Sequence, residues 1–189
     1  MAKIKICGLR REEDAQFVND ARPDLAGFVF APSKRQIKLK QAIRLRQLIS
    51  DDIPTVGVFV NAPLVEMVDA VKSGAISIVQ LHGGEDETVV AALQSNGIPV
   101  IKVTRETTQA NYQMVDSGKG SGVPLDWNQI VKQPHKPLFL AGGLNTTNII
   151  EAIEKVAPDF VDVSSGAETK GIKDFDKINE LVKLAHGIA

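Results

Sequence analysis

Short runs of β-branched and apolar residues alternate with longer amphipathic stretches along this chain of 189 residues. The short runs are typical of buried strands, and apolar residues at helical spacing are typical of helices that cover a sheet. Repeated strand-helix units form a parallel sheet with the helices outside. The strand-like runs are residues 3–6, 25–30, 55–60, 77–81, 99–103, 112–116, 137–141 and 160–163.

The helical stretches follow these strands in turn. They begin at about residue 12, cover 39–49, 64–72, 85–94 and 148–155, and end with a helix from Asp174. Eight such units predict an α/β fold of the (β/α)₈ TIM-barrel type, as a single domain over residues 1–189. That fold commonly needs about 200 residues or more. Because residues 105–111 are too few for a packed helix, we expect the fifth helix to be reduced to a loop.

The composition limits the kinds of partner and of catalytic chemistry that are expected. A net charge of -1 gives no reason to expect a nucleic-acid partner, and no apolar run is long enough to cross a bilayer. The chain enters a strand at once rather than a signal peptide, which predicts a cytoplasmic location. One cysteine and three scattered histidines, without CxxC or HExxH spacing, predict no metal site. Acid–base or nucleophilic chemistry by side chains is therefore expected.

Two glycine-containing loops predict a phosphate site. In a barrel of this type the active site lies at the carboxyl ends of the strands. Gly142 and Gly143 follow the seventh strand, and Ser164, Ser165 and Gly166 follow the eighth. Backbone N–H groups at helix starts favour an anion there. Alternatively, the glycine pair forms only a tight turn, with Asn145 or Thr146 as a helix cap.

Cys7 ends the first strand and has two interpretations. An unpaired cysteine there can be a buried small hydrophobe or a reactive thiol. Strand alternation puts Lys3, Lys5 and Cys7 on one face and Ile4 and Ile6 on the other. Lys5 should then point into the barrel beneath Cys7, where its ammonium would favour the thiolate that a general base needs.

Asp126 follows a loop that contains Gly120, Ser121 and Gly122. A loop of this composition can close over a small ligand and bring one carboxyl group to it. Alternatively, Asp126 caps a sixth helix that begins at Trp127. The two roles are compatible.

Two further side chains are candidates for substrate contacts. Arg35 lies in a basic loop after the second strand, which can be simply solvated or can clamp a carboxylate through the guanidinium fork. His82 shares a strand face with Gln80, and is either a histidine satisfied at the rim of the core or a contact to substrate.

The segments KIKICG (3–8), QLHG (80–83), GSGVPLDW (120–127), AGGLN (141–145) and VDVSSG (161–166) occur in order at successive strand ends. Together they resemble the phosphoribosylanthranilate isomerase family of tryptophan biosynthesis. The resemblance implies an Amadori rearrangement of N-(5'-phosphoribosyl)anthranilate, a small phosphorylated substrate, by a monomer or homodimer. It also implies that neither a metal nor an organic cofactor takes part.

The same resemblance implies roles for individual residues. Cys7 would be the general base and Asp126 the general acid, and Arg35 would hold the anthranilate carboxylate. Gly143, Ser164, Ser165 and Gly166 would bind the phosphate, and Asp162 would contact a substrate hydroxyl or support the groups that do. The chain departs from the family pattern in three places, namely the short connection before the sixth strand, Val123 and Leu125.

Two alternatives belong to other functional classes. Indole-glycerol-phosphate synthase and the tryptophan synthase α subunit share fold and phosphate loops with this family, but they rely on a lysine or glutamate as general acid. A barrel that only binds a sugar phosphate would need neither Cys7 nor Asp126. Finally, Lys5 and Asp162 should both face inward on neighbouring strands, so we expect the two buried charges to pair.

Overall fold

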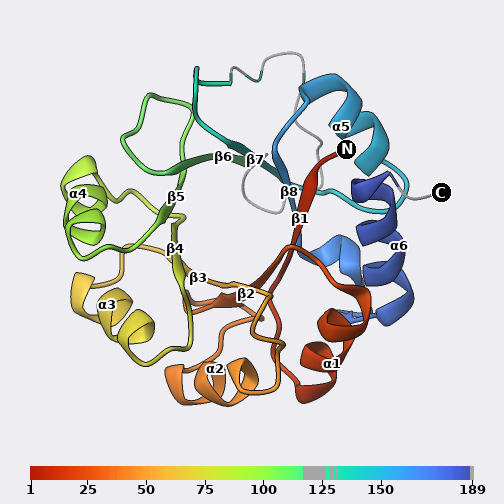
Figure 1. The fold of residues 1–189 in the computed structure, drawn as a ribbon, viewed down its shortest axis with the longest axis horizontal. Helices are drawn as coiled ribbons and strands as arrows, with labels where there is room; N and C mark the ends of the chain where they lie inside the picture. The colour runs from red at the N-terminus through yellow and green to blue at the C-terminus, as the bar shows by residue number, and fades with distance from the viewer. Residues whose placement is uncertain (117–126, 128–129, 131, 188–189) are drawn as a thin grey trace.

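Eight parallel strands close into a barrel in chain order (Figure 1). The computed structural model describes residues 1–116, 127, 130 and 132–187. The barrel confirms the fold predicted from strand-helix alternation. Its strands are β1 (Lys3–Cys7), β2 (Leu25–Val29), β3 (Thr55–Phe59), β4 (Ile78–Leu81), β5 (Val100–Val103), β6 (Tyr112–Asp116), β7 (Leu138–Ala141) and β8 (Phe160–Val163).

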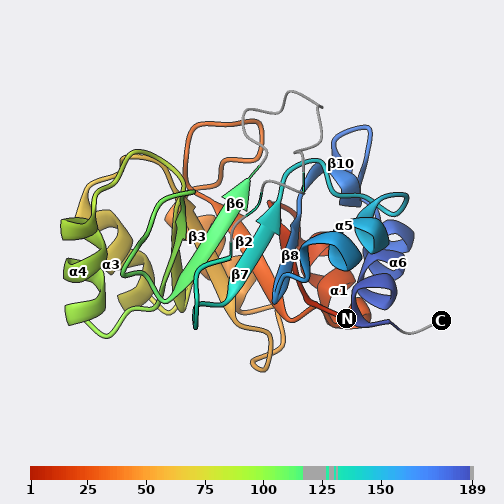
Figure 2. The same cartoon turned by 90° about the horizontal axis from the view of Figure 1, so that it is seen from above.

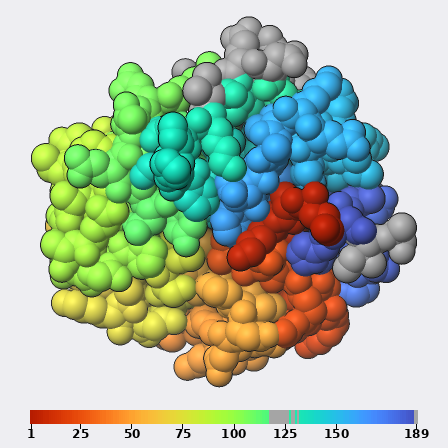
Figure 3. All heavy atoms as spheres, turned by 45° about the horizontal axis from the view of Figure 1, so that its top comes forward, coloured from red at the N-terminus to blue at the C-terminus, as the bar shows by residue number. Residues whose placement is uncertain are grey.

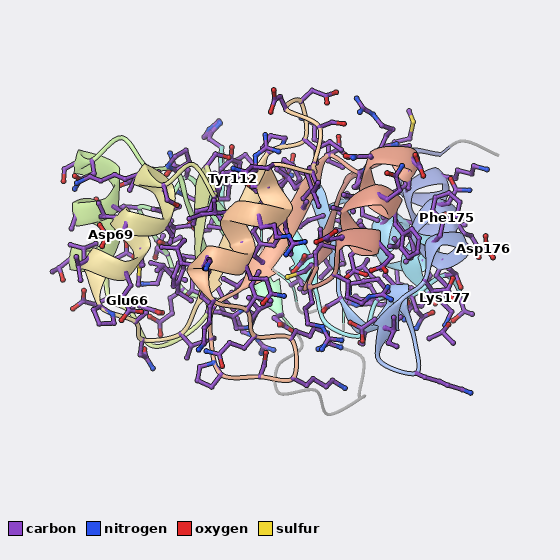
Figure 4. The ribbon with its side chains drawn as sticks, turned by 90° about the horizontal axis from the view of Figure 1, so that it is seen from below. Glu66, Asp69, Tyr112, Phe175, Asp176 and Lys177 are labelled. Carbon is purple, nitrogen blue, oxygen red and sulfur yellow. The ribbon has the colours of Figure 1, made fainter. Side chains whose placement is uncertain are left out.

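Six α-helices surround the barrel in the described part of the chain (Figure 1). They are α1 (Glu12–Ala21), α2 (Leu39–Arg46), α3 (Leu64–Lys72), α4 (Glu87–Ser95), α5 (Ile149–Val156) and α6 (Phe175–His186). Figure 4 labels Glu66 and Asp69 on α3 and Phe175, Asp176 and Lys177 on α6. Apolar residues between the strands and this outer layer, such as Ile4, Ile6 and Phe28, are fully buried.

Two helix bounds differ from the prediction by more than one residue. α2 ends at Arg46 rather than at 49, and the Arg46 guanidinium donates to the carbonyl oxygens of Ile49 and Ser50, in the turn that follows the helix. α4 begins at Glu87 rather than at 85, because Asp86 is its N-cap and accepts from the N–H groups of Thr88 and Val89. Local side-chain bonds to the backbone therefore occur at both ends.

The connection from β5 to β6 is a loop, as predicted. No helix stands outside this part of the barrel in Figure 1. Two side chains of α4 hold the loop instead: Glu87 accepts from the N–H of Gln109, and Gln94 donates to its carbonyl oxygen. Most of the connection after β6, where a sixth helix was expected, lies outside the described residues.

The barrel interior is apolar in its lower part and polar above. Leu25, Val56, Ile101, Met114 and Phe139 pack together inside the strands. The rings of Phe139 and Phe160 stack at 4.2 Å between centroids, with the Tyr112 ring (labelled in Figure 4) edge-on to both. Above this apolar floor, the inward positions carry Lys5, Gln80 and Asp162.

A two-stranded hairpin not expected from the sequence extends from the carboxyl end of the barrel. It follows a 3₁₀ turn (η2, Ser165–Ala167) and consists of β9 (Glu168–Thr169) and β10 (Ile172–Lys173). Figure 2 shows it beyond the strand arrowheads, on the side opposite the N-terminus. The hairpin therefore stands at the end of the barrel where the predicted site lies.

Candidate active site

Lys5 and Asp162 form a buried ion pair at the base of the site. They are partners in the register of β1 and β8, and Lys5 Nζ lies 3.0 Å from Asp162 Oδ1. The same ammonium donates to Gln80 Oε1 at 2.7 Å. Asp162 Oδ1 makes this contact as an ion pair only, since no described donor meets it with hydrogen-bond alignment. The predicted pairing of the two charges is confirmed.

Burial would lower the pKa of Lys5, but the neighbouring Asp162 carboxylate and Cys7 thiol raise that pKa above its ordinary value. Because that pKa is raised, Lys5 remains an ammonium at neutral pH although its side chain is fully buried. The upper interior of the barrel thus holds a fixed positive charge next to Cys7.

Cys7 lies at the end of β1, with its side chain almost buried. Its neighbour across the strand pair is Gly27, and a Cβ atom there would lie 3.0 Å from both Cys7 Sγ and Lys5 Cε. β2 can approach this closely because Gly27 has no side chain. The small residue on β2 leaves room for the thiol and the ammonium beneath it.

Burial raises the pKa of the Cys7 thiol, and the lowering by Lys5 and Lys173 does not offset it. The Lys5 ammonium favours the thiolate, as expected, but burial has the larger effect and the pKa of Cys7 is raised. Desolvation disfavours the charged form more strongly than one nearby cation favours it.

Arg35 pairs with a carboxylate of the chain itself. Its Nε donates to Glu168 Oε1 at 2.6 Å and its Nη2 to Glu168 Oε2 at 2.8 Å. This two-bond geometry is the strong form of an arginine–carboxylate contact. The arginine passes over Gly8, where a Cβ atom would lie 2.6 Å from Arg35 Cδ. Arg35 is thus held beside the residue that follows Cys7.

Glu168 also binds Lys173, its partner in the hairpin register. Lys173 Nζ lies 2.9 Å from Glu168 Oε1 and donates to the Ser164 carbonyl oxygen at 2.8 Å. Burial opposes ionisation of Glu168, but Arg35 and Lys173 lower the pKa of this carboxyl to about 2. Burial lowers the pKa of Lys173, although Glu168 counters it.

Glu168 and Lys173 were missed from the sequence, although a signal was present. Lys170 and Gly171 both adopt positive φ, at 53° and 78°, as a two-residue hairpin turn requires. A Lys-Gly pair between a glutamate and a lysine, each two residues away, would have indicated a hairpin with opposite charges across it.

The loops after β7 and β8 pack against each other. Gly142 and Gly143 have φ of 100° and 68°, as a tight turn favours, but the N-cap of α5 is Asn148 rather than Asn145 or Thr146. A Cβ atom on Gly166 would overlap the carbonyl oxygen of Leu144, so the two loops touch through this glycine. Among the described residues, none accepts a hydrogen bond from the N–H groups of Gly143, Ser165 and Gly166. These donors suit an anion at the start of the loops.

The Ser164 side chain points to β1 rather than to the expected phosphate site. Its Oγ donates to the carbonyl oxygen of Cys7 at 3.1 Å, which ties the end of β8 to the end of β1. The hydroxyl fixes the glycine loop relative to Cys7.

His82 has a protein partner at each ring nitrogen. Nε2 lies 3.2 Å from Asp116 Oδ2, and Nδ1 lies 3.0 Å from Gln80 Nε2. Because Gln80 Oε1 accepts from Lys5, its amide nitrogen faces His82 as a donor, so Nδ1 is the acceptor and Nε2 carries the proton. This geometry favours the histidine satisfied at the rim of the core.

The proposed acid and its loop, Gly120, Ser121, Gly122 and Asp126, lie outside the described residues. Among the residues that are described, no cluster of three or more histidine, cysteine, aspartate or glutamate side chains could bind a metal ion. Within the same part of the chain, no helix is long and apolar enough to span a bilayer.

A hollow of about 870 Å³ opens at the other end of the barrel, on the face that Figure 3 shows around the N-terminal residues. Met1, Lys3, Tyr112, Pro137 and Phe160 are among its lining residues. It lies below the apolar floor, away from Cys7 and the glycine loops, and we assign no chemistry to it.

Known proteins resemble this chain over its full length. A curated relative from Endomicrobium trichonymphae, N-(5'-phosphoribosyl)anthranilate isomerase, is 46% identical over 201 residues, with all of both chains covered. The phosphoribosyl anthranilate isomerase from Thermotoga maritima superposes with a TM-score of 0.87 at 36% identity, over 99% of this chain and 100% of that one.

A second solved structure is that of a phosphoribosyl anthranilate isomerase in complex with reduced 1-(o-carboxyphenylamino)-1-deoxyribulose 5-phosphate. It has a TM-score of 0.84 and 35% identity, over 99% of this chain and 100% of that one. The family model described as N-(5'phosphoribosyl)anthranilate (PRA) isomerase matches residues 4–184. The chain belongs to the N-(5'-phosphoribosyl)anthranilate isomerase family.

Proposed function

We propose that this protein converts N-(5'-phosphoribosyl)anthranilate to 1-(2-carboxyphenylamino)-1-deoxyribulose 5-phosphate, as an isomerase of tryptophan biosynthesis. The observation that carries the proposal is one cluster at the carboxyl end of the strands. There Cys7 carries a buried thiol, its carbonyl oxygen accepts a hydrogen bond from Ser164 of the glycine loops, and Arg35 passes over the next residue, Gly8. A reactive group and two anion-binding elements thus meet at one end of the barrel.

The substrate carries two anionic groups, and the site offers a match for each. The N–H groups of Gly143, Ser165 and Gly166 suit the phosphate, because it can accept hydrogen bonds from several backbone donors at once. Arg35 suits the anthranilate carboxylate through the edge of its guanidinium that Glu168 leaves open. In the related complex the bound ligand likewise has a phosphate and a carboxyphenyl group.

We assign the proton transfers to Cys7 and Asp126. Asp126, in its acid form, gives a proton to the ribose ring oxygen, so that the ring opens to a Schiff base. Cys7 then removes the proton from C2', and the resulting enolamine tautomerises to the ketone. Lys5 and Lys173 favour the thiolate form of Cys7 during this step, against the effect of burial.

His82 and Asp162 have supporting places in this proposal. Asp162 holds the Lys5 ammonium near Cys7. Both ring nitrogens of His82 are engaged by the protein, so His82 offers the substrate its ring face. The phosphorylated substrate is the partner that we propose; a cytoplasmic location and a monomeric or homodimeric state stay predictions of the sequence.

A fluorescence assay tests the function directly. Phosphoribosylanthranilate is fluorescent, and its signal should decay when the purified protein turns it over. Binding without decay would instead support a barrel that only binds a sugar phosphate, and so contradict the proposal. Indoleglycerol phosphate added as substrate should give no indole, which separates the isomerase from a lyase that cleaves this compound.

A further inference from the structure

Glu168 is a charged residue near the site that takes no part in the proposed reaction, and both of its carboxylate oxygens bind cationic side chains. Its side chain is only 5% exposed, although it lies on a short strand of a surface hairpin. It binds Arg35 through both oxygens and Lys173 through one. A buried carboxylate between two cations links the loop after β2 to the hairpin after β8.

The contact decides which way the guanidinium faces. Glu168 takes the edge of Arg35 formed by Nε and Nη2. A guanidinium has five N–H donors, so the other edge, Nη1 with the second N–H of Nη2, can still bind a carboxylate through two bonds. Because the fork is planar, fixing one edge fixes the direction of the other.

The position of Glu168 is itself fixed from several sides. Lys177, labelled on α6 in Figure 4, donates to the Glu168 carbonyl oxygen at 2.8 Å. Lys173 bridges Glu168 Oε1 and the carbonyl oxygen of Ser164, the residue that also bonds to Cys7. Through Glu168 and Lys173, the orientation of Arg35 is therefore fixed relative to the same loop that holds the phosphate donors.

We propose that Glu168 is a positioning residue that turns the open edge of Arg35 toward the carboxylate of the substrate. This inference rests on the proposed function, in which Arg35 receives that carboxylate. Through Arg35, Glu168 sets the preference for a ring that carries a carboxylate over one that does not.

Charge leads to the same preference. Arg35 and Lys173 contribute two positive charges and Glu168 one negative charge, so the group has a net charge of +1. One substrate carboxylate brings it to zero. A substrate without the carboxylate leaves the open edge of Arg35 unpaired, which disfavours its binding.

The experiment compares two substrates in two proteins. The substrates are N-(5'-phosphoribosyl)anthranilate and N-(5'-phosphoribosyl)aniline, which lacks only the carboxylate. In the wild-type protein, kcat/KM should favour the carboxylated substrate by about 10- to 100-fold, the range for a charge-assisted contact. In Glu168→Gln this ratio should fall by about tenfold, through KM, because loss of the fixed guanidinium direction outweighs the added positive charge. For the aniline compound kcat/KM should change little.

A structural role would lower kcat/KM equally for both substrates, and an unchanged ratio in Glu168→Gln would overturn the inference. Asp52→Asn is the matched control, because it removes an exposed carboxylate that also pairs with an arginine, Arg22. It should leave the ratio unchanged. Should Glu168→Gln fail to fold, Glu168→Asp keeps the charge but shortens the reach, and must lower the ratio in the same direction.

Binding separates this inference from the proposed function. Calorimetry with the reduced product analogue, with and without its carboxylate, gives the same ratio without turnover. A wild-type protein that turns over neither substrate would contradict the function. A carboxylate preference in binding that Glu168→Gln leaves intact would contradict the positioning role alone.

Discussion

The Lys5 ammonium lies 3.0 Å from the Asp162 carboxylate, across the seam where the last strand of the barrel meets the first. Both side chains are shielded from bulk solvent, with exposed fractions of 0% for Lys5 and 9% for Asp162. Each charge therefore depends on the other for compensation. The pair closes the barrel and places a cation beneath the reactive thiol.

Removal of one member of this pair should destabilise the protein strongly. Asp162→Asn leaves Lys5 buried without its counter-charge, at an expected cost of about 3 to 5 kcal/mol in the free energy of unfolding. Urea denaturation measures it. Glu151→Gln, which breaks the exposed ion pair with Lys155, should cost less than about 1 kcal/mol. Similar losses in the two variants would show that the buried pair is not special.

The pH dependence of thiol alkylation should report the surroundings of Cys7. Because burial raises the pKa of the thiol, the iodoacetamide rate should rise with its midpoint above the ordinary thiol range of about 8.5. Lys5→Met removes a cation that favours the thiolate, so the midpoint should move higher still. A curve identical to that of the wild-type protein would mean that Lys5 does not tune Cys7.

Much of the site could be predicted because strand alternation and parallel order are strong constraints. Lys5 and Cys7 had to share a face of β1, and Asp162 had to lie beside Lys5 once the barrel closed. What alternation does not give is the balance of opposing effects. Whether Lys5 or burial has the larger effect on the pKa of Cys7 depends on how tightly Gly27 packs against the side chains of Lys5 and Cys7. Only the three-dimensional contacts show this packing.

The partner of Arg35 could not be predicted in the same way. Glu168 is 133 residues away along the chain, on a strand of two residues in a loop. Neither helical nor strand periodicity extends over so short an element. The helix bounds at Arg46 and Glu87 were missed for a related reason, because the side chains of Arg46 and Asp86 bond to nearby backbone groups there and such bonds leave no periodicity.

The proton-transfer roles predict large losses in turnover. Cys7→Ala and Asp126→Asn should each lower kcat by at least about 10²-fold, the usual scale for a positioned acid or base. Substrate affinity should change little, because neither residue is assigned to an anionic group. Single-turnover fluorescence with phosphoribosylanthranilate separates the two effects. Near-normal turnover in either variant would remove that residue from its role.

Substitutions at Arg35 test anion recognition. Arg35→Ala should raise KM more than it lowers kcat, since the carboxylate is bound in ground and transition states alike. Arg35→Lys should restore only part of the affinity, because one ammonium lacks the two edges that serve Glu168 and the substrate. Lys34→Ala, in the same loop but exposed, should leave both constants unchanged. Full rescue by lysine would mean that any positive charge suffices.

Glu168 should make the protein sensitive to acid. The pKa of its carboxyl is about 2 in the folded chain, against an ordinary value of 4.5. A carboxyl with a lowered pKa adds stability above the pKa it has in the unfolded chain, and this stability is lost as the pH falls toward its pKa in the folded chain.

The difference in unfolding free energy between the wild-type protein and Glu168→Gln should therefore be greatest above about pH 5 and shrink toward pH 2. Urea denaturation at each pH measures this difference, with Asp52→Asn as the control for an exposed pair. Parallel stability curves for the wild-type protein and Glu168→Gln would show that the ion pairs with Arg35 and Lys173 do not lower the pKa of Glu168 in the folded state.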